Sequence, residues 1–193
     1  MPESFYHIYN RGVNKAPIFR DEQDYVVFLG LLKRYLGKEI EARANREPHP
    51  NYYDQIELTA FCLMENHFHL CVYQHTDRAI KDLMKSISVA YSMYFNRRYK
   101  RVGPIFQQRY RAVRITDDGQ LLHISRYIHM NPFDYKNFAW SSLPYYVRTR
   151  SASWVRPGRI MELFEGTDYL EFLAEYEGRR DELNTLKDEL ANA

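Results

Sequence analysis

Two histidines, His67 and His69, have the spacing that most directly suggests chemistry in this chain. They stand one residue apart in HFHLCVYQ (residues 67–74), a segment rich in aromatic and β-branched residues that predicts a strand. Successive side chains of a strand point to opposite faces, so both imidazoles share one face and Phe68 takes the other. Two neutral imidazoles so placed can bind one divalent cation, and oxygen ligands could complete the shell of Mg²⁺ or Mn²⁺. Two ordinary core or surface histidines would show the same spacing.

A tyrosine and an asparagine stand four residues apart in RYIHMNP (residues 126–132). On a helix, Tyr127 and Asn131 share a face. The Tyr127 phenol could serve as a nucleophile, and the Asn131 carbonyl oxygen could be the third ligand of a metal held by the two histidines. Pro132 disfavours helical geometry at the residue before it. A buried tyrosine and a helix-terminal asparagine, without any chemistry, remain the alternative for each residue alone.

The densest basic run of the chain, residues 97–114, contains seven basic residues and no acid. Cations interleaved with aromatic rings suit nucleic acid, because cations contact phosphates and rings stack on bases. A solvated helix end followed by a charged strand face would look the same. If the last part of this run is a strand, Arg109 and Arg111 share a face and Arg114 takes the other. The candidate DNA-binding residues are Asn10, Arg11, Arg97, Arg98, Phe106, Arg109, Tyr110, Arg111 and Arg114.

Composition places these residues in a globular protein. The chain has 193 residues, with 45% hydrophobic and 27% charged residues, and it holds no apolar run long enough for a membrane span. The net charge of +2 divides into −6 from Gly158 onward and +8 before it. Two cysteines cannot form a disulfide framework, and the N-terminus carries no secretory pattern. We therefore expect a cytoplasmic protein that does not enter a membrane.

The elements that must position these residues follow from apolar periodicity and capping signals. Strands are predicted at residues 5–10, 56–64, 67–74 and 109–115, and helices at 21–38, 77–99 and 117–130, with a polar loop at 41–55. The order β-α-β-β-α-β predicts an α+β, ferredoxin-like sandwich with a four-stranded antiparallel sheet and two helices on one face. The last of these helices is left to pack on the open sheet face. We expect a domain at 1–150 and an acidic helical extension at 151–193.

Several motifs in combination resemble those of a known family. HFHL at 67–70 resembles the HUH signature (histidine, hydrophobic residue, histidine) of single-tyrosine nucleases. The motifs that occur in the order seen in the transposases of that group are YHIYNRG (6–12), LMENHFHL (63–70), FQQRYRAVRI (106–115), RYIHMNP (126–132) and WSS (140–142). The match is closest to the REP-associated tyrosine transposases and covers residues 5–145.

The resemblance implies a metal-dependent single-stranded DNA endonuclease and strand transferase. Tyr127 would be the catalytic tyrosine that forms a covalent 5′-phosphotyrosine link and releases a 3′-hydroxyl, which can later rejoin DNA. His67, His69 and Asn131 would hold Mg²⁺ or Mn²⁺, although insertion-sequence relatives commonly use glutamine at the third position. The implied partner is single-stranded or hairpin DNA, such as repetitive extragenic palindromes. The enzyme would act as a monomer or as a homodimer that swaps the tyrosine helix.

Two other readings stay open from the sequence. A four-stranded ferredoxin-like sheet also underlies RRM domains, so the chain could be a non-catalytic module that binds single-stranded nucleic acid on an open sheet face. The strands lack the RNP1 pattern of those domains. The same enzyme class also includes replication and mobilisation initiators, but the small size of this chain counts against that role.

Overall fold

The computed structural model describes residues 1–39, 48–164 and 168–179. Its main elements are β1 (Ser4–Arg11), α1 (Glu22–Leu36), β2 (Ile56–Met64), β3 (His67–Gln74), α2 (Ala79–Arg98), β4 (Arg111–Ile115) and α3 (Asp118–Met130). Shorter helices are η1 (Val13–Lys15), α4 (Leu143–Tyr146), α5 (Gly158–Met161), α6 (Tyr169–Ala174) and η2 (Glu177–Arg179). The predicted α+β class and β-α-β-β-α-β order are confirmed.

The four strands form one antiparallel sheet in the order β2-β3-β1-β4. The bounds of β2 and β3 are those predicted, because two apolar runs flank a two-residue turn at Glu65 and Asn66. β1 lies between β3 and β4, and its register places Tyr9 opposite His69 and Arg11 opposite His67. β1 is therefore aligned residue by residue with β3, the strand that carries the two histidines.

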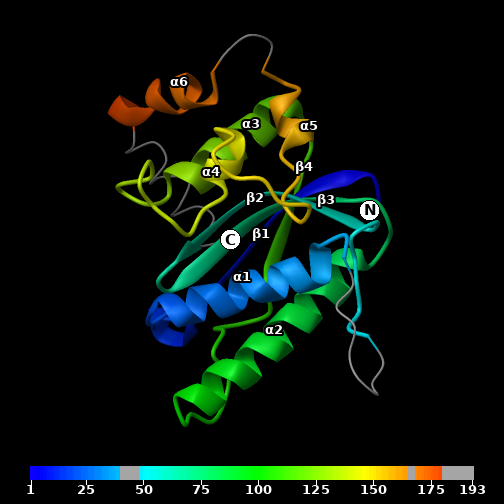
Figure 1. Ribbon diagram of the computed structural model, residues 1–193, viewed down its shortest axis with the longest axis vertical. Coiled ribbons are helices and arrows are strands. Elements are labelled where there is room, and N and C mark those ends of the chain that lie inside the picture. The colour runs from blue at the N-terminus through cyan, green and yellow to red at the C-terminus, as the bar shows by residue number, and fades with distance from the viewer. Residues whose placement is uncertain (40–47, 165–167, 180–193) are drawn as a thin grey trace.

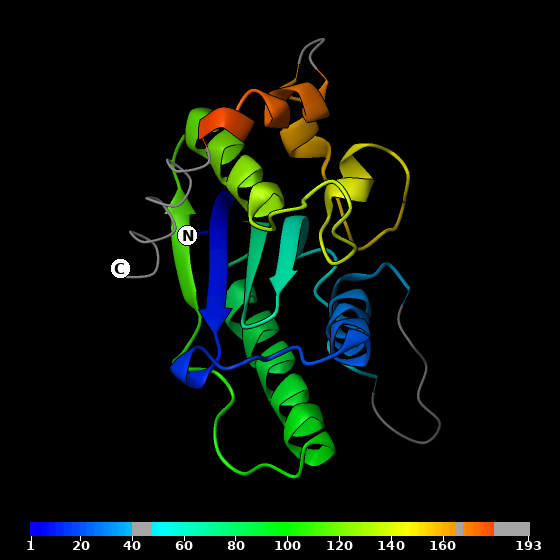
Figure 2. The same cartoon turned by 90° about the vertical axis from the view of Figure 1, so that its left-hand side faces the viewer.

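The sheet separates two cores. On one face, α1 and α2 pack against the alternate residues Ile8, Phe68 and Leu70. On the other face, α3 and the segment after it pack against residues such as Cys71. Figures 1 and 2 show the sheet between α1 and α2 on one side and α3 to α6 on the other. The prediction that the extra helix covers the open sheet face is confirmed.

A buried carboxylate aligns the two helices of the first core. Asp24 of α1 is fully buried and accepts hydrogen bonds from Tyr94 of α2 and from Tyr99 at its end, both at 2.8 Å. Arg98 donates to the same carboxylate at 2.8 Å and also pairs with Asp21, which caps the start of α1. The buried carboxylate of Asp24 is stabilised by these hydrogen bonds, and they hold the C-terminal end of α2 against the start of α1.

Two of the predicted elements, β4 and α2, begin two residues later than expected. β4 begins at Arg111 rather than at Arg109, because Phe106 forms an isolated bridge with Gly12 and residues 107–110 leave the ladder. α2 begins at Ala79 rather than at 77, after Arg78 in a left-handed conformation. Residues 48–55 of the predicted loop contain no helix or strand, and residues 41–47 lie outside the described part.

The C-terminal segment contributes to the second core. Ile160, Tyr169 and Leu173 are buried there, and residues 180–193 lie outside the described part. The boundary at residue 150 stays a prediction. Within the described ranges, no helix is both long and apolar enough to cross a bilayer.

Replacing Asp24 by alanine should destabilise the fold by about 3 kcal/mol, because it leaves Arg98 and two tyrosine hydroxyls without their shared acceptor. Urea unfolding measures the change. Glu22→Ala, an exposed acid in the same helical turn, is the matched control and should change stability by less than about 0.5 kcal/mol. Equal effects of the two substitutions would show that the buried network contributes nothing.

Candidate active site

The two histidines of β3 lie on the face of the sheet that α3 covers, as predicted. His67 and His69 are almost fully buried, and their ring centroids lie 5.0 Å apart. The Nδ1 atom of each ring is held by a neighbour: His67 Nδ1 lies 2.6 Å from Asn66 Oδ1, and His69 Nδ1 lies 2.9 Å from His7 Nε2. The Nε2 atoms of both rings are thereby directed at the end of α3.

The environment of His67 suits a cation at its Nε2 atom. Asn66 Oδ1 can only accept, so His67 Nδ1 carries the proton of that bond. The Asn66 amide is oriented by its Nδ2 group, which donates to Lys15 O at 3.0 Å. On the other side of the ring, Nε2 lies 3.2 Å from the acceptor Asn131 Oδ1. With its proton on Nδ1, the neutral ring presents the lone pair of Nε2 toward Asn131, the side from which a metal ion could bind.

Tyr127 of α3 completes this group. Its hydroxyl oxygen lies 3.4 Å from His69 Nε2, and its ring stands edge-on to the His69 ring with centroids 5.1 Å apart. Burial raises the pKa of the Tyr127 phenol above its ordinary value, whereas the side chains of Asn131 and Arg11 act in the opposite direction. The structure thus brings together the four residues singled out from the sequence, and all four belong to one chain.

Asn131 takes a position that the sequence left open. It lies directly after α3 and keeps a helical conformation, with φ −57° and ψ −43°, despite the proline that follows. Its Oδ1 atom faces His67, and its buried Nδ2 atom has no hydrogen-bond partner among the described residues. The Oδ1 atom of this amide could ligate a hard divalent ion, and its Nδ2 group could donate to an oxygen of a bound phosphate.

Two site residues were missed in the sequence analysis, His7 and Asn66. His7 of β1 is buried, and desolvation lowers its pKa to about 3, so its ring is neutral. It holds His69 through Nε2, while its Nδ1 atom has no partner among the described residues. His7 lies within the motif at 6–12 and Asn66 directly precedes the histidine pair, but only the strand register and the turn geometry reveal their roles.

A second buried histidine fixes the helix that carries Tyr127. His129 is fully buried, and its Nδ1 and Nε2 atoms each lie 2.7 Å from a hydroxyl, of Tyr169 and Ser142 respectively. Tyr169 donates onward to Ser125. A neutral ring that donates from Nδ1 to the Tyr169 hydroxyl leaves that hydroxyl free to donate to Ser125, so these groups form one chain of bonds. His129 of α3, the N-cap residue of α4 and Tyr169 of α6 are therefore linked on the side of α3 away from His69.

The candidate DNA-binding residues are distributed over both sides of the sheet. Arg11 lies opposite His67 and Arg111 lies opposite Tyr9, which places both on the face of the histidines. Arg114 lies opposite Tyr6, on the other face. The expectation that Arg109 shares a strand face with Arg111 is wrong, because Arg109 precedes the strand and lines a cavity beside α2.

Two further candidates occupy the end of α2. Arg97 is exposed there, whereas Arg98 is engaged by Asp21 and Asp24, which gives it a structural role. Asn10 is buried, and its amide donates to Gln108 O at 3.1 Å. Contact with DNA stays a prediction for each of these residues.

The donor set fits a metal with mixed nitrogen and oxygen ligands. His67 Nε2, His69 Nε2 and Asn131 Oδ1 face the same side, and both Nδ1 atoms are held by neighbours, which is the usual arrangement around a ligating imidazole. Within the described ranges, no three residues drawn from histidine, cysteine, aspartate and glutamate gather as a metal site. An ion here would need Asn131 and oxygen atoms from elsewhere, such as a phosphate.

The pKa of His129 gives a prediction about acid stability. Burial lowers the pKa of His129 to about 3, while histidine in the unfolded chain has a pKa near ~6.5. The stability that the neutral ring contributes is therefore fully present above about pH 6.5 and is lost as the pH falls toward 3. Between about pH 7 and pH 5, protonation of His129 in the unfolded chain should lower the free energy of unfolding by about 2 kcal/mol. Urea unfolding of the His129→Gln variant should show a correspondingly weaker pH dependence. An unchanged dependence would exclude His129 as the responsible group.

Comparisons with known proteins concern the family and the fold of this chain. The family model described as "Transposase IS200 like" matches residues 36–131, the stretch that holds His67, His69, Tyr127 and Asn131. Among solved structures, the chain is similar to a REP-associated tyrosine transposase bound to a REP hairpin, with 14% identity over 88% of this chain and 90% of that chain and a TM-score of 0.55. A comparison with curated proteins gives no match. The shared fold and the matching family model place the chain in the IS200-like transposase family.

Proposed function

We propose that this chain is a metal-dependent single-stranded DNA endonuclease and strand transferase that works through a covalent 5′-phosphotyrosine. The observation that carries the proposal is the position of the Tyr127 hydroxyl, 3.4 Å from His69 Nε2 and on the same face as His67 and Asn131. A nucleophile, two imidazoles and an amide oxygen from separate elements converge there. Membership of a transposase family gives this convergence its chemical context.

In the proposed reaction, Tyr127 Oη attacks the phosphorus of a DNA phosphodiester. The Oη–P bond forms, the bond from phosphorus to the 3′ oxygen breaks, and the phenol proton is in effect exchanged for the proton of the released 3′-hydroxyl. The number of phosphoester bonds is unchanged, so a 3′-hydroxyl can reverse the step and join a new strand. Tyr127 is 3% exposed, and this burial limits attack by water on the covalent intermediate.

The surrounding side chains control the reactivity of the phenol. Because burial raises the pKa of Tyr127, the free enzyme keeps it protonated, and Asn131 and Arg11 favour the phenolate. A divalent ion such as Mg²⁺ or Mn²⁺, held by His67, His69 and Asn131, would polarise the scissile phosphate. Arg11, which faces the same side, is placed to neutralise the charge that develops on that phosphate.

The proposed DNA path follows the edge of the sheet. β4 is an edge strand whose residues 111–114 are exposed, and Arg111 lies on the catalytic face. A phosphate backbone that passes Arg111 and Arg11 would reach Tyr127. The solved structure with a REP hairpin bound suggests that hairpin DNA is the substrate of this chain as well.

Two alternatives from the sequence are less well supported. An RRM-like module needs an open sheet face, but α3 covers the outer face over β2 and β3, with Ile124 and Ile128 buried against the strands. A dimer with swapped tyrosine helices is not needed for catalysis, since Tyr127 reaches the histidines of its own chain. We therefore propose a catalytically complete monomer.

Covalent adduct formation tests the proposed function. Incubation with a labelled single-stranded hairpin DNA and Mn²⁺ should give a protein–DNA adduct that survives denaturing electrophoresis, and Tyr127→Phe should abolish it. Tyr9, whose ring centroid lies 6.0 Å from that of His69, is the matched control because it is a second phenol on this face near the histidines. An adduct that persists in Tyr127→Phe and is lost in Tyr9→Phe would transfer the role to Tyr9.

His7 should set the metal affinity of the site. When His69 presents the lone pair of its Nε2 atom to a metal, its Nδ1 group donates to His7 Nε2. Loss of His7 would let the His69 ring turn or change tautomer. We expect His7→Phe to weaken Mn²⁺ binding by roughly 10–100-fold, measured by electron paramagnetic resonance without DNA. His75→Gln, directly after the far end of β3, should leave the affinity unchanged. Equal binding by wild type and His7→Phe would contradict this role.

A further inference from the structure

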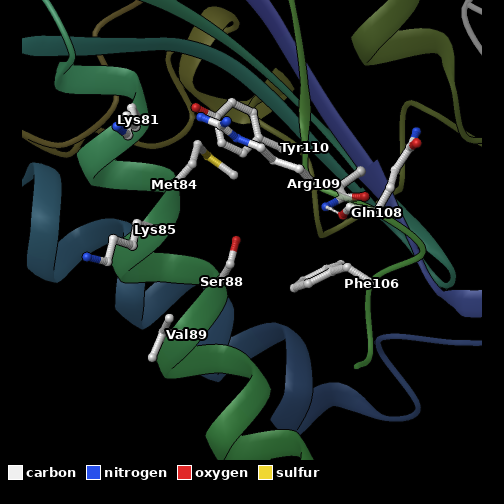
Figure 3. A pocket seen from close by; sticks show the side chains of 10 residues that line it. Lys81, Met84, Lys85, Ser88, Val89, Phe106, Gln108, Arg109 and Tyr110 are labelled. Carbon is white, nitrogen blue, oxygen red and sulfur yellow. Dashed lines mark hydrogen bonds between the residues drawn. The ribbon is translucent and has the colours of Figure 1, made fainter. Parts of the chain in front are cut away.

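A cavity of about 310 Å³ lies on the opposite side of the sheet from Tyr127, between α2 and the segment that leads into β4. Figure 3 shows its lining: residues 81–89 contribute one wall, and residues 106–110 contribute the other, with the Phe106 ring directed across the cavity toward Ser88. We call it the α2 pocket. Its volume is at the lower end of the range for small-molecule sites, which suits a single ring system.

The α2 pocket is built by two extra residues in the chain beside β1. Tyr9 pairs with Arg111, and Gly12 pairs with Phe106. Two residues of β1 thus face four residues, 107–110, on the neighbouring segment. The amide of Asn10 donates to Gln108 O at 3.1 Å, and its Oδ1 atom accepts from Arg11 N at 2.9 Å, so the bulged segment is fixed to the strand. The pocket is therefore preformed.

The lining combines aromatic surface with positive charge. Phe106, Tyr110 and Met84 supply apolar area, and the Arg109 guanidinium lies 5.4 Å from the centre of the Tyr110 ring. Lys81 and Lys85 add two cations from α2. None of the ten described residues that line the pocket is acidic. Rings that stack on a base, surrounded by cations that contact the flanking phosphates, are the combination by which proteins hold single-stranded nucleic acid.

The position of the α2 pocket relates it to the catalytic face. Along β1, Asn10 points toward α2, while its neighbours Tyr9 and Arg11 point toward the histidines. The exposed edge strand β4 and the segment that leads into it lie between the two sides. A DNA strand that crosses this edge can leave one nucleotide in the pocket and carry its neighbours toward Tyr127.

We propose that the α2 pocket binds one unpaired nucleobase of the DNA strand that the catalytic face cleaves, and so fixes where along the strand cleavage occurs. This inference rests on the proposed function for its substrate, but it concerns a separate site. It assigns Met84, Lys81, Lys85 and Ser88 to substrate binding, none of which belongs to the catalytic group. Stacking supplies the affinity, so the pocket distinguishes strands that carry bases from strands that do not.

Fluorescence anisotropy with two labelled strands of equal length, oligothymidine and an abasic sugar-phosphate strand, isolates base binding, because both carry the same phosphate charge. Wild type should bind oligothymidine roughly tenfold more tightly, as one stacked base implies. Ser88→Phe, which fills the pocket, and Tyr110→Ala, which removes one ring, should each abolish this preference. Ser92→Phe, one turn further along α2 and outside the lining, should keep it.

The outcomes separate the two proposals. Equal binding of the two strands by wild type, or full preference in both pocket variants, would overturn the α2 pocket as a base site. Tyr127→Phe should keep the preference, because binding needs no chemistry. If Tyr127→Phe forms no adduct but still prefers strands that carry bases, its defect concerns only the catalytic step. Two pocket variants are used so that a folding defect in one, visible by circular dichroism, does not decide the result.

Discussion

The register of β1 against β3 is the constraint on which the site depends. It places His7 opposite Cys71, Tyr9 opposite His69 and Arg11 opposite His67. Because side chains alternate along a strand, a slip of one residue would turn these three β1 side chains into the apolar core and expose Ile8 to the polar face. The buried residues Ile8 and Phe68 exclude that slip, since both are needed between the sheet and the two helices. The core on one face thus specifies the chemistry on the other.

The second requirement is a fixed position for α3. Tyr127 and His129 are two residues apart and point in different directions: one meets His69, and the other meets Ser142 and Tyr169. A neutral buried imidazole with both nitrogens bonded tolerates little rotation of the helix, because any turn leaves a buried polar atom unpaired. Segments far along the chain therefore hold Tyr127 in place, and α6, which is buried in the same core as α3, takes part through Tyr169.

The sequence was informative where a local rule sufficed. Period-two alternation predicted the face of His67 and His69, and helical spacing predicted that Tyr127 and Asn131 face the same way. It was uninformative where the answer required a partner distant in the chain. His7 looked like any strand residue until the register paired its strand with β3. Arg98 looked like a free cation of a basic run, although Asp24, 74 residues away, already engages it.

β1 and β4 show how one short edge of the sheet can serve two sites. His7, Tyr9 and Arg11 of β1 lie on the face of His67 and His69, while Asn10 lines the α2 pocket on the other face of the sheet. β4 is short, exposed and carries Arg111 and Arg114, features that discourage pairing with another sheet edge. The same features leave the edge open to a polyanion. The charge on this edge therefore disfavours pairing with another sheet and, in the proposed function, is available to contact DNA.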